Sequence, residues 1–103
     1  MKKRTIRNLR ESLEGKIYVY LGSEEICRKF YKDAEGEGFM FGADVSPLMS
    51  PYNDVISLEN HCLSHAGFAG HLGFHHPEAV VGGCHRIDYE KYIRGDSDYF
   101  YTD

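Results

Sequence analysis

The spacing of apolar residues along the chain predicts short helices and strands that alternate. Residues 5–14 place apolar side chains on a narrow helical stripe, whereas residues 16–21 alternate in the manner of a strand. A second helix begins after Ser23, a favourable N-cap, and ends at Gly36 and Gly38. Further strands are predicted over residues 39–41 and 54–59.

Residues 42–53 connect two of these strands and show little periodicity. Pro47 and Pro51 mark the segment as a loop. A loop of this length in so small a domain is typically either mobile or functional.

Residues 61–76 form the most distinctive stretch, because they hold five of the six histidines. Successive side chains of a strand point to opposite faces, so a strand here would separate its residues by parity. The even positions would form an apolar face that includes Phe68, Leu72 and Phe74. The odd positions would carry four imidazoles: His61, His65, His71 and His75.

The segment after the histidines predicts a hairpin. Pro77 favours a turn over residues 76–79, and residues 80–88 would return as the next, antiparallel strand. Counting from this turn pairs His71 with Cys84 and Phe74 with Val81. One face of the hairpin would then gather five polar or reactive side chains: His65, His71, His75, Cys84 and Arg86.

The predicted elements indicate an α+β domain. Residues 89–95 add a short helical turn, so the order is α-β-α-β-β-β-β-α with a mainly antiparallel sheet. Residues 1–103 are expected to form a single domain, because the length is close to the commonest domain size. Residues 1–4 and 96–103 are expected to be flexible tails.

Composition and charge narrow the classes of function. The chain is 42% hydrophobic and 14% aromatic, which argues against disorder. A net charge of -4 argues against general nucleic-acid binding, although basic residues crowd the N-terminus. No apolar run follows that basic segment, so neither a signal peptide nor a membrane anchor is predicted.

The three cysteines do not form a disulfide framework. Cys27 falls on the apolar face of the second helix and is expected in the core. Cys62 and Cys84 lie in or near the histidine-rich half. Reduced thiols make the cytoplasm the expected compartment.

The polar face of the hairpin suggests binding of a small anionic ligand. Arginine offers a bidentate fork to phosphate or carboxylate, imidazoles add donors, and a tyrosine ring can stack on a base. The candidate ligand-binding residues are His65, His71, His75, Arg86, Tyr18, Tyr89 and Arg94. A solvated sheet face that merely tolerates histidine is the simpler alternative.

Zinc binding is a second hypothesis for the same face. Neutral imidazole and thiolate are good zinc ligands, and opposed residues on paired strands lie close enough to share an ion. The candidate ligands are His71, Cys84 and His75. Nucleophilic catalysis by Cys84 with His71 lacks an oxyanion element, so we expect a non-enzymatic protein.

Three segments resemble small uncharacterised proteins of bacterial phages and mobile elements: residues 17–30, 67–71 and 86–93. The resemblance implies a context in which such proteins act against host defences. They do so by sequestering a nucleotide signal or by binding a host defence protein directly. We therefore expect a counter-defence binding protein, and the abundant aromatic residues favour a homo-oligomer.

Overall fold

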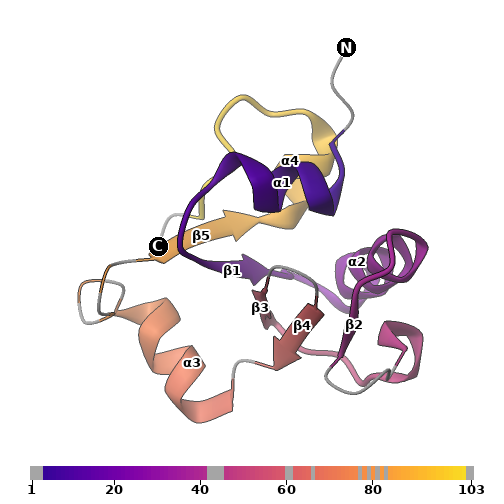
Figure 1. The fold of residues 1–103 in the computed structure, drawn as a ribbon, viewed down its shortest axis with the longest axis horizontal. Coiled ribbons are helices and arrows are strands. Elements are labelled where there is room, and N and C mark those ends of the chain that lie inside the picture. The colour runs from indigo at the N-terminus through magenta and orange to yellow at the C-terminus, as the bar shows by residue number, and fades with distance from the viewer. Residues whose placement is uncertain are drawn as a thin grey trace.

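The structure is a computed structural model, and it describes residues 4–41, 46–59, 62–65, 67–76 and 84–101, with residues 78, 80 and 82. The elements in chain order are α1 (Ile6–Ser12), β1 (Lys16–Tyr20), α2 (Glu24–Gly36), β2 (Met40–Phe41), the 3-10 turn η1 (Pro47–Met49), β3 (Val55–Leu58), β4 (Cys62–His65), α3 (Gly67–His75), β5 (Cys84–Asp88) and α4 (Tyr89–Arg94). Figure 1 shows this arrangement.

The described strands form one five-stranded mixed sheet in the order β2-β4-β3-β1-β5. The two central pairings, β4 with β3 and β3 with β1, are antiparallel, and the two outer pairings are parallel. The prediction of an α+β domain is confirmed. The predicted helices near residues 5–14, 23–36 and 89–95 and the strands near 16–21, 39–41 and 54–59 all form.

One face of the sheet carries the main core. The described core residues come from all five strands and from three helices, α1, α2 and α4. Ile17, Val19 and Ile87 belong to the same buried cluster as Phe30, which has no exposed surface. Cys27 is 1% exposed and belongs to this core, as its place on the apolar face of the helix predicted.

Local capping explains where the helices of this layer begin and end. The Ser23 side chain accepts a hydrogen bond from the Ile26 amide, which satisfies a free donor at the start of α2. The Thr5 side chain does the same for the Asn8 amide at the start of α1. Gly95 ends α4 with a φ of 91°, a left-handed conformation that glycine adopts without a Cβ clash.

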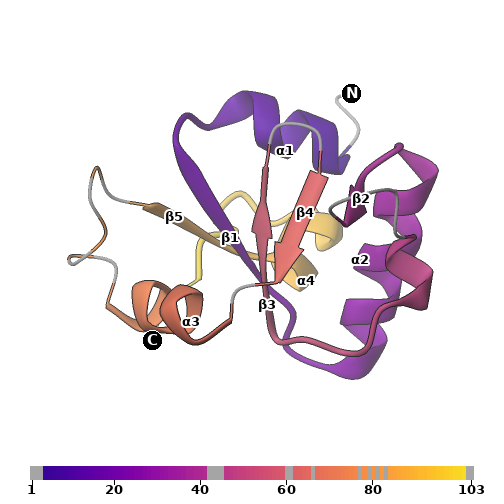
Figure 2. The ribbon, with the colours of Figure 1, turned by 60° about the horizontal axis from the view of Figure 1, so that its bottom comes forward.

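The other face of the sheet is covered by α3, which stands apart from the other helices in Figures 1 and 2. Phe74 of α3 is fully buried against Tyr18 and Val55. Gly73 permits this close approach, because a Cβ there would lie 3.1 Å from both Tyr18 Oη and Val80 Cγ2. The helix therefore packs directly on the Tyr18 ring of β1.

The prediction of one strand over residues 61–76 is wrong for most of that stretch. Only Cys62–His65 is a strand, and Gly67–His75 is helical. Glycines disfavour an isolated helix by about 1 kcal/mol each relative to alanine, but tertiary packing overrides that preference here. The four imidazoles consequently do not share a strand face; His61 lies outside the described residues.

The predicted hairpin is also wrong, because β5 pairs with β1 in parallel rather than with the histidine-rich segment. Cys84 lies opposite Lys16, and Arg86 lies opposite Tyr18. The proposed pair of His71 with Cys84 is therefore absent, and Val81, the proposed partner of Phe74, lies outside the described residues. Two residues of the predicted turn, Pro77 and Ala79, fall outside the described part of the chain.

Residues 99–101 lie along the outer edge of β5, in a segment that the sequence assigned to a tail. The Asp88 amide donates to the Tyr99 carbonyl, and the Tyr101 amide donates to the Arg86 carbonyl. These bonds satisfy backbone groups that an edge strand would otherwise expose. Among the described helices, none has the length and apolarity that a bilayer crossing needs.

Candidate functional site

Arg86 of β5, the central cation of the predicted anion site, is engaged with α3. Its Nη1 donates to the Phe74 carbonyl at 3.0 Å, near the C-terminal end of the helix. The guanidinium also lies over the rings of Phe74 and Tyr101, at 5.5 Å and 5.3 Å from their centroids. Arg86 thus holds α3 and the C-terminal segment against the sheet.

His71 and His65 contact neighbouring residues at the start of β3. His71 Nε2 donates to Asp54 Oδ1 at 2.7 Å, so a carboxylate already occupies one side of this imidazole. Asn53 Nδ2 donates to His65 Nδ1 at 2.8 Å, and the His65 ring stacks on Phe41 with centroids 4.4 Å apart. Asn53 and Asp54, which directly precede β3, therefore contact both the end of β4 and α3.

Tyr18, Tyr89 and Arg94 are not positioned to bind one ligand together. Tyr18 is 3% exposed beneath α3, whereas Tyr89 is buried in the main core on the opposite face of the sheet. Tyr89 Oη donates to Asp33 Oδ2 at 2.6 Å, and burial together with this carboxylate raises its pKa. Arg94 is exposed on α4 and forms an ion pair with Asp96 at 2.7 Å.

The proposed zinc ligands have different surroundings. His75 is exposed at the end of α3, and Cys84 is half-buried at the start of β5. Burial raises the pKa of the Cys84 thiol, while the positive charges of Arg86 and Lys16 oppose that rise. The described residues contain no group of three or more His, Cys, Asp or Glu side chains that could hold a metal ion.

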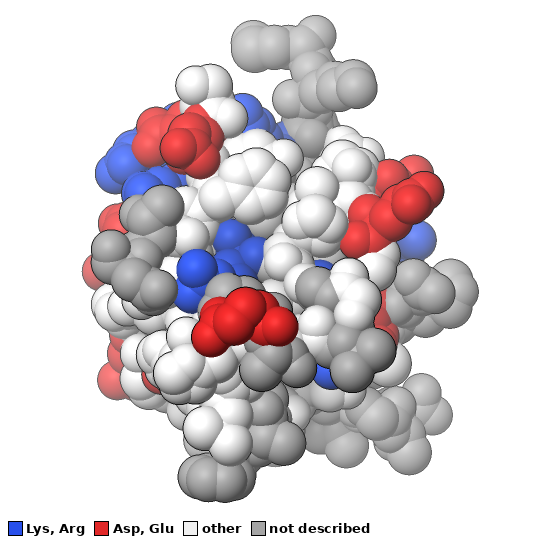
Figure 3. Space-filling model, turned by 90° about the vertical axis from the view of Figure 1, so that its left-hand side faces the viewer, with Lys and Arg blue, Asp and Glu red and all other residues white. Residues whose placement is uncertain are grey.

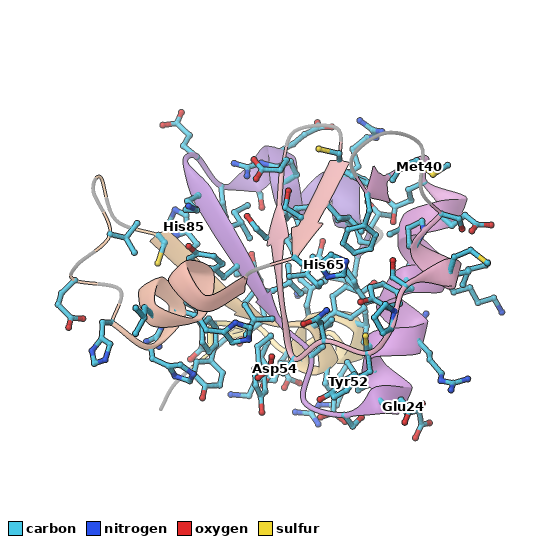
Figure 4. All side chains as sticks on the ribbon, turned by 90° about the horizontal axis from the view of Figure 1, so that it is seen from below. Glu24, Met40, Tyr52, Asp54, His65 and His85 are labelled. Atoms are coloured by element: carbon cyan, nitrogen blue, oxygen red, sulfur yellow. The ribbon has the colours of Figure 1, made fainter. Side chains whose placement is uncertain are left out.

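Figure 3 shows the side of the molecule that carries α3 and the beginning of β5. Lys and Arg atoms lie near the middle of this face, with Asp and Glu atoms around them. In Figure 4 the labelled His65 and His85 lie well apart, on β4 and β5. The candidate histidine and arginine side chains thus lie on β4, α3, β5 and α4 rather than at one point.

A groove that the sequence did not assign lies between α2 and residues 48–52. Its volume is about 490 Å³, and the residues that line it are Glu24, Cys27, Arg28, Tyr31, Lys32, Leu48, Ser50, Pro51 and Tyr52. Cys27 and Tyr31 are buried and form its inner wall. The lining therefore combines an apolar interior with charged side chains of α2.

Two tyrosines fix the wall of this groove. Tyr31 Oη donates to the Pro51 carbonyl at 2.8 Å, and burial raises the Tyr31 pKa. Tyr52 Oη donates to the Leu21 carbonyl at 3.2 Å, while its ring remains exposed. Burial and then the negative charge of Asp54 raise the Tyr52 pKa, so both hydroxyls stay protonated donors at neutral pH.

Large apolar side chains are exposed beside the groove. Leu48 is 55% exposed, Met49 80% and Tyr52 47%, and these are three of the five large hydrophobic residues that are exposed in the described structure. Figure 4 shows Tyr52 and Glu24 at the same end of α2. A signal for this site exists in the sequence, because Leu48 and Met49 are apolar residues in a proline-bounded loop.

Comparison with known proteins gives no relative from which a role could be transferred. No family model matches the chain, and neither a curated protein nor a solved structure resembles it significantly. The function therefore has to be inferred from the geometry of this chain.

Proposed function

We propose that this chain is a non-enzymatic protein-binding module that takes an apolar segment of a partner protein into the groove between α2 and residues 48–52. The observation that carries the proposal is the clustering of Leu48, Met49 and Tyr52, all exposed, next to a groove with a buried apolar wall. Exposed apolar clusters on a folded domain commonly mark interaction sites.

The size of the groove favours a protein segment as its occupant. At about 490 Å³ it is large enough for one or two bulky side chains of a partner. Interfaces usually derive most of their affinity from a few such anchors, which fill pockets surrounded by side chains that exclude water. Leu48, Met49 and Tyr52 would supply that surrounding contact.

The α3 face gives less support to the original hypothesis of nucleotide binding. Arg86 is occupied by the Phe74 carbonyl and two rings, and His71 faces the Asp54 carboxylate, which would repel a phosphate. Nucleotide sequestration stays a prediction, which isothermal titration against cyclic and linear nucleotides can test. Zinc binding likewise stays a prediction, for elemental analysis of the purified chain.

Direct binding of a host defence protein is the form of the counter-defence hypothesis that the groove supports. The resemblance of residues 17–30, 67–71 and 86–93 to phage and mobile-element proteins suggests that context, and α2 contributes both to the first segment and to the groove wall. Binding alone would suffice for such a role, because occupying a partner's functional surface blocks it without chemistry.

Selection from a displayed library of random peptides tests the proposed groove. The immobilised wild-type chain should enrich peptides that share a large aliphatic or aromatic anchor. Tyr52→Ser and Leu48→Asp should each weaken binding of those peptides at least tenfold, because truncating an anchor contact commonly costs about 1–2 kcal/mol. Dissociation constants from fluorescence anisotropy provide the measurement.

A matched variant controls for a general loss of surface apolarity. Leu72 is 49% exposed on α3, outside the groove, so Leu72→Asp should leave peptide binding unchanged. The proposal is refuted if no peptide is enriched, or if the enriched peptides bind the Tyr52→Ser and Leu48→Asp variants as tightly as the wild-type chain. A second copy of this chain is the rival occupant, and groove-dependent dimers in sedimentation velocity would favour it.

A further inference from the structure

We infer that the segment bound in the groove is acidic beside its apolar anchor, an inference that rests on the proposed function and identifies the chemistry of its partner. The groove is lined by two cations and one carboxylate of α2: Arg28, Lys32 and Glu24. Their formal sum is positive, although the whole chain carries a net charge of -4. The local charge of the groove is thus opposite to that of the molecule.

The pairing of these side chains leaves Lys32 as the cation that a partner can use. Arg28 Nη2 forms an ion pair with Glu24 Oε1 at 2.6 Å across one turn of α2, which offsets one charge of each sign. Lys32 has no ion pair among the described residues, and it is exposed. A carboxylate that approaches the groove would therefore meet an uncompensated ammonium group.

The positive charge continues on the far side of Lys32. A neighbouring shallow hollow is lined by Arg4, Lys29, Lys32, Asp33 and Glu37, together with small and apolar residues. Its two carboxylates already have partners within the domain. Asp33 accepts from Lys29 Nζ and from Tyr89 Oη, and Glu37 accepts from the amides of Ile6 and Arg7.

The cations of α2 form a basic ridge of Arg28, Lys29 and Lys32, of which Arg28 and Lys32 line the groove, while Lys32 and Lys29 line the neighbouring hollow with Arg4. Opposite potentials on two surfaces favour encounter and fix the orientation of binding. An acidic partner would be repelled by most of this acidic chain and attracted at the ridge. The apolar anchor and the acidic flank of the segment would thus be recognised by adjacent parts of one surface.

A nucleic-acid strand is a poorer match for the same ridge. A phosphate backbone presents a charge at every nucleotide and needs a run of cations along its path. Here Glu24 and Glu25 lie exposed at the start of the same helix, and the wall of the groove is apolar. Side-chain carboxylates next to one anchor require only the few cations that the ridge provides.

Three synthetic versions of one groove-selected peptide test the inference. The versions keep the same anchor and differ only in their flanks, which carry Asp, Asn or Lys. The Asp version should bind the wild-type chain about fivefold more tightly than the Asn version, because exposed ion pairs contribute modestly. Added salt should reduce that difference, since it screens exposed charges.

Charge reversal supplies the specific readout. Lys32→Glu should abolish the preference for Asp flanks and favour the Lys version. The control Lys16→Glu makes the same change of net charge at a residue outside the groove, so it should preserve the preference for Asp flanks. Fluorescence anisotropy measures all combinations, and a thermal melt of each variant confirms that it folds.

The outcomes separate this inference from the proposed function. If the Asp and Asn versions bind equally well and Tyr52→Ser still weakens both, the inference of an acidic flank is wrong and the proposed groove still stands. Failure of all three versions to bind would refute both. Single-stranded oligonucleotides are also tested as competitors of the Asp version on the wild-type chain. If they displace it, and that displacement is lost in both the Tyr52 and the Lys32 variants, nucleic acid rather than an acidic segment is the ligand, and the inference is overturned.

Discussion

Replacing Phe74 with alanine should lower the free energy of unfolding by about 3–5 kcal/mol, the usual cost of removing a fully buried phenylalanine. The ring has no exposed surface, and its centroid lies 4.7 Å from that of Tyr101 and 5.9 Å from that of Tyr20. Its loss would also remove the ring beneath the Arg86 guanidinium. Urea unfolding followed by circular dichroism measures the change.

The same helix offers a matched control. Leu72 is 49% exposed two residues earlier, so Leu72→Ala should cost no more than about 0.5 kcal/mol. Phe74→Leu retains part of the apolar volume and should give an intermediate value. Equal effects of Phe74→Ala and Leu72→Ala would contradict the packing of α3 on the sheet.

Replacing Glu37 with alanine should destabilise the domain by about 2 kcal/mol, because charge-assisted hydrogen bonds contribute more than neutral ones. Glu37 follows α2, yet its carboxylate accepts hydrogen bonds from the amides of Ile6 and Arg7, each at 2.9 Å. The first turn of α1 has no acidic residue of its own. Glu37 therefore supplies the negative charge that the start of a helix favours.

A substitution series distinguishes this cap from a general effect of charge. Glu37→Gln keeps one acceptor oxygen without the charge and should cost roughly half as much as Glu37→Ala. Glu11 is exposed on α1, so Glu11→Ala should change the unfolding free energy by less than about 0.5 kcal/mol. Denaturant midpoints compare the variants. A Glu37→Ala variant as stable as Glu11→Ala would show that α1 does not need the cap.

Elements specified by local signals were predictable from the sequence. Ser23 caps α2, and the apolar residues that follow it recur at helical spacing. The helix can therefore be recognised without knowing which residues elsewhere in the chain pack against it. Alternation over residues 16–21 likewise identified β1, because its side chains separate into two packed faces. Both signals lie within the residues that form the element.

The region around α3 was not predictable in this way, because its fold depends on distant contacts. Phe74 and His71 fit a strand by parity and a helix by spacing, and a short apolar stretch cannot distinguish the two. Gly73 weakens an isolated helix but allows close contact with Tyr18, more than fifty residues earlier. The parallel pairing of β5 with β1 is equally non-local.

In the candidate site, too, features that depend on local sequence were predictable, whereas those that depend on distant contacts were not. The abundance of histidine predicted a site within residues 61–76, whereas the groove is formed by one face of α2 and a loop about twenty residues later. Cys27 was predictable as a core residue, but its role as part of a groove wall follows only from the position of residues 48–52. Tyr31 joins the two through its bond to the Pro51 carbonyl.

Mapping a groove-selected peptide onto the chain by NMR tests the central proposal most directly. Titration into the isotope-labelled protein, followed through its backbone amide signals, reports which residues sense the ligand. The account predicts the largest shifts at residues 24–32 and 48–52, with little change along α3 and β5. Shifts concentrated at residues 71–75 and 84–88, with the groove unaffected, would contradict it.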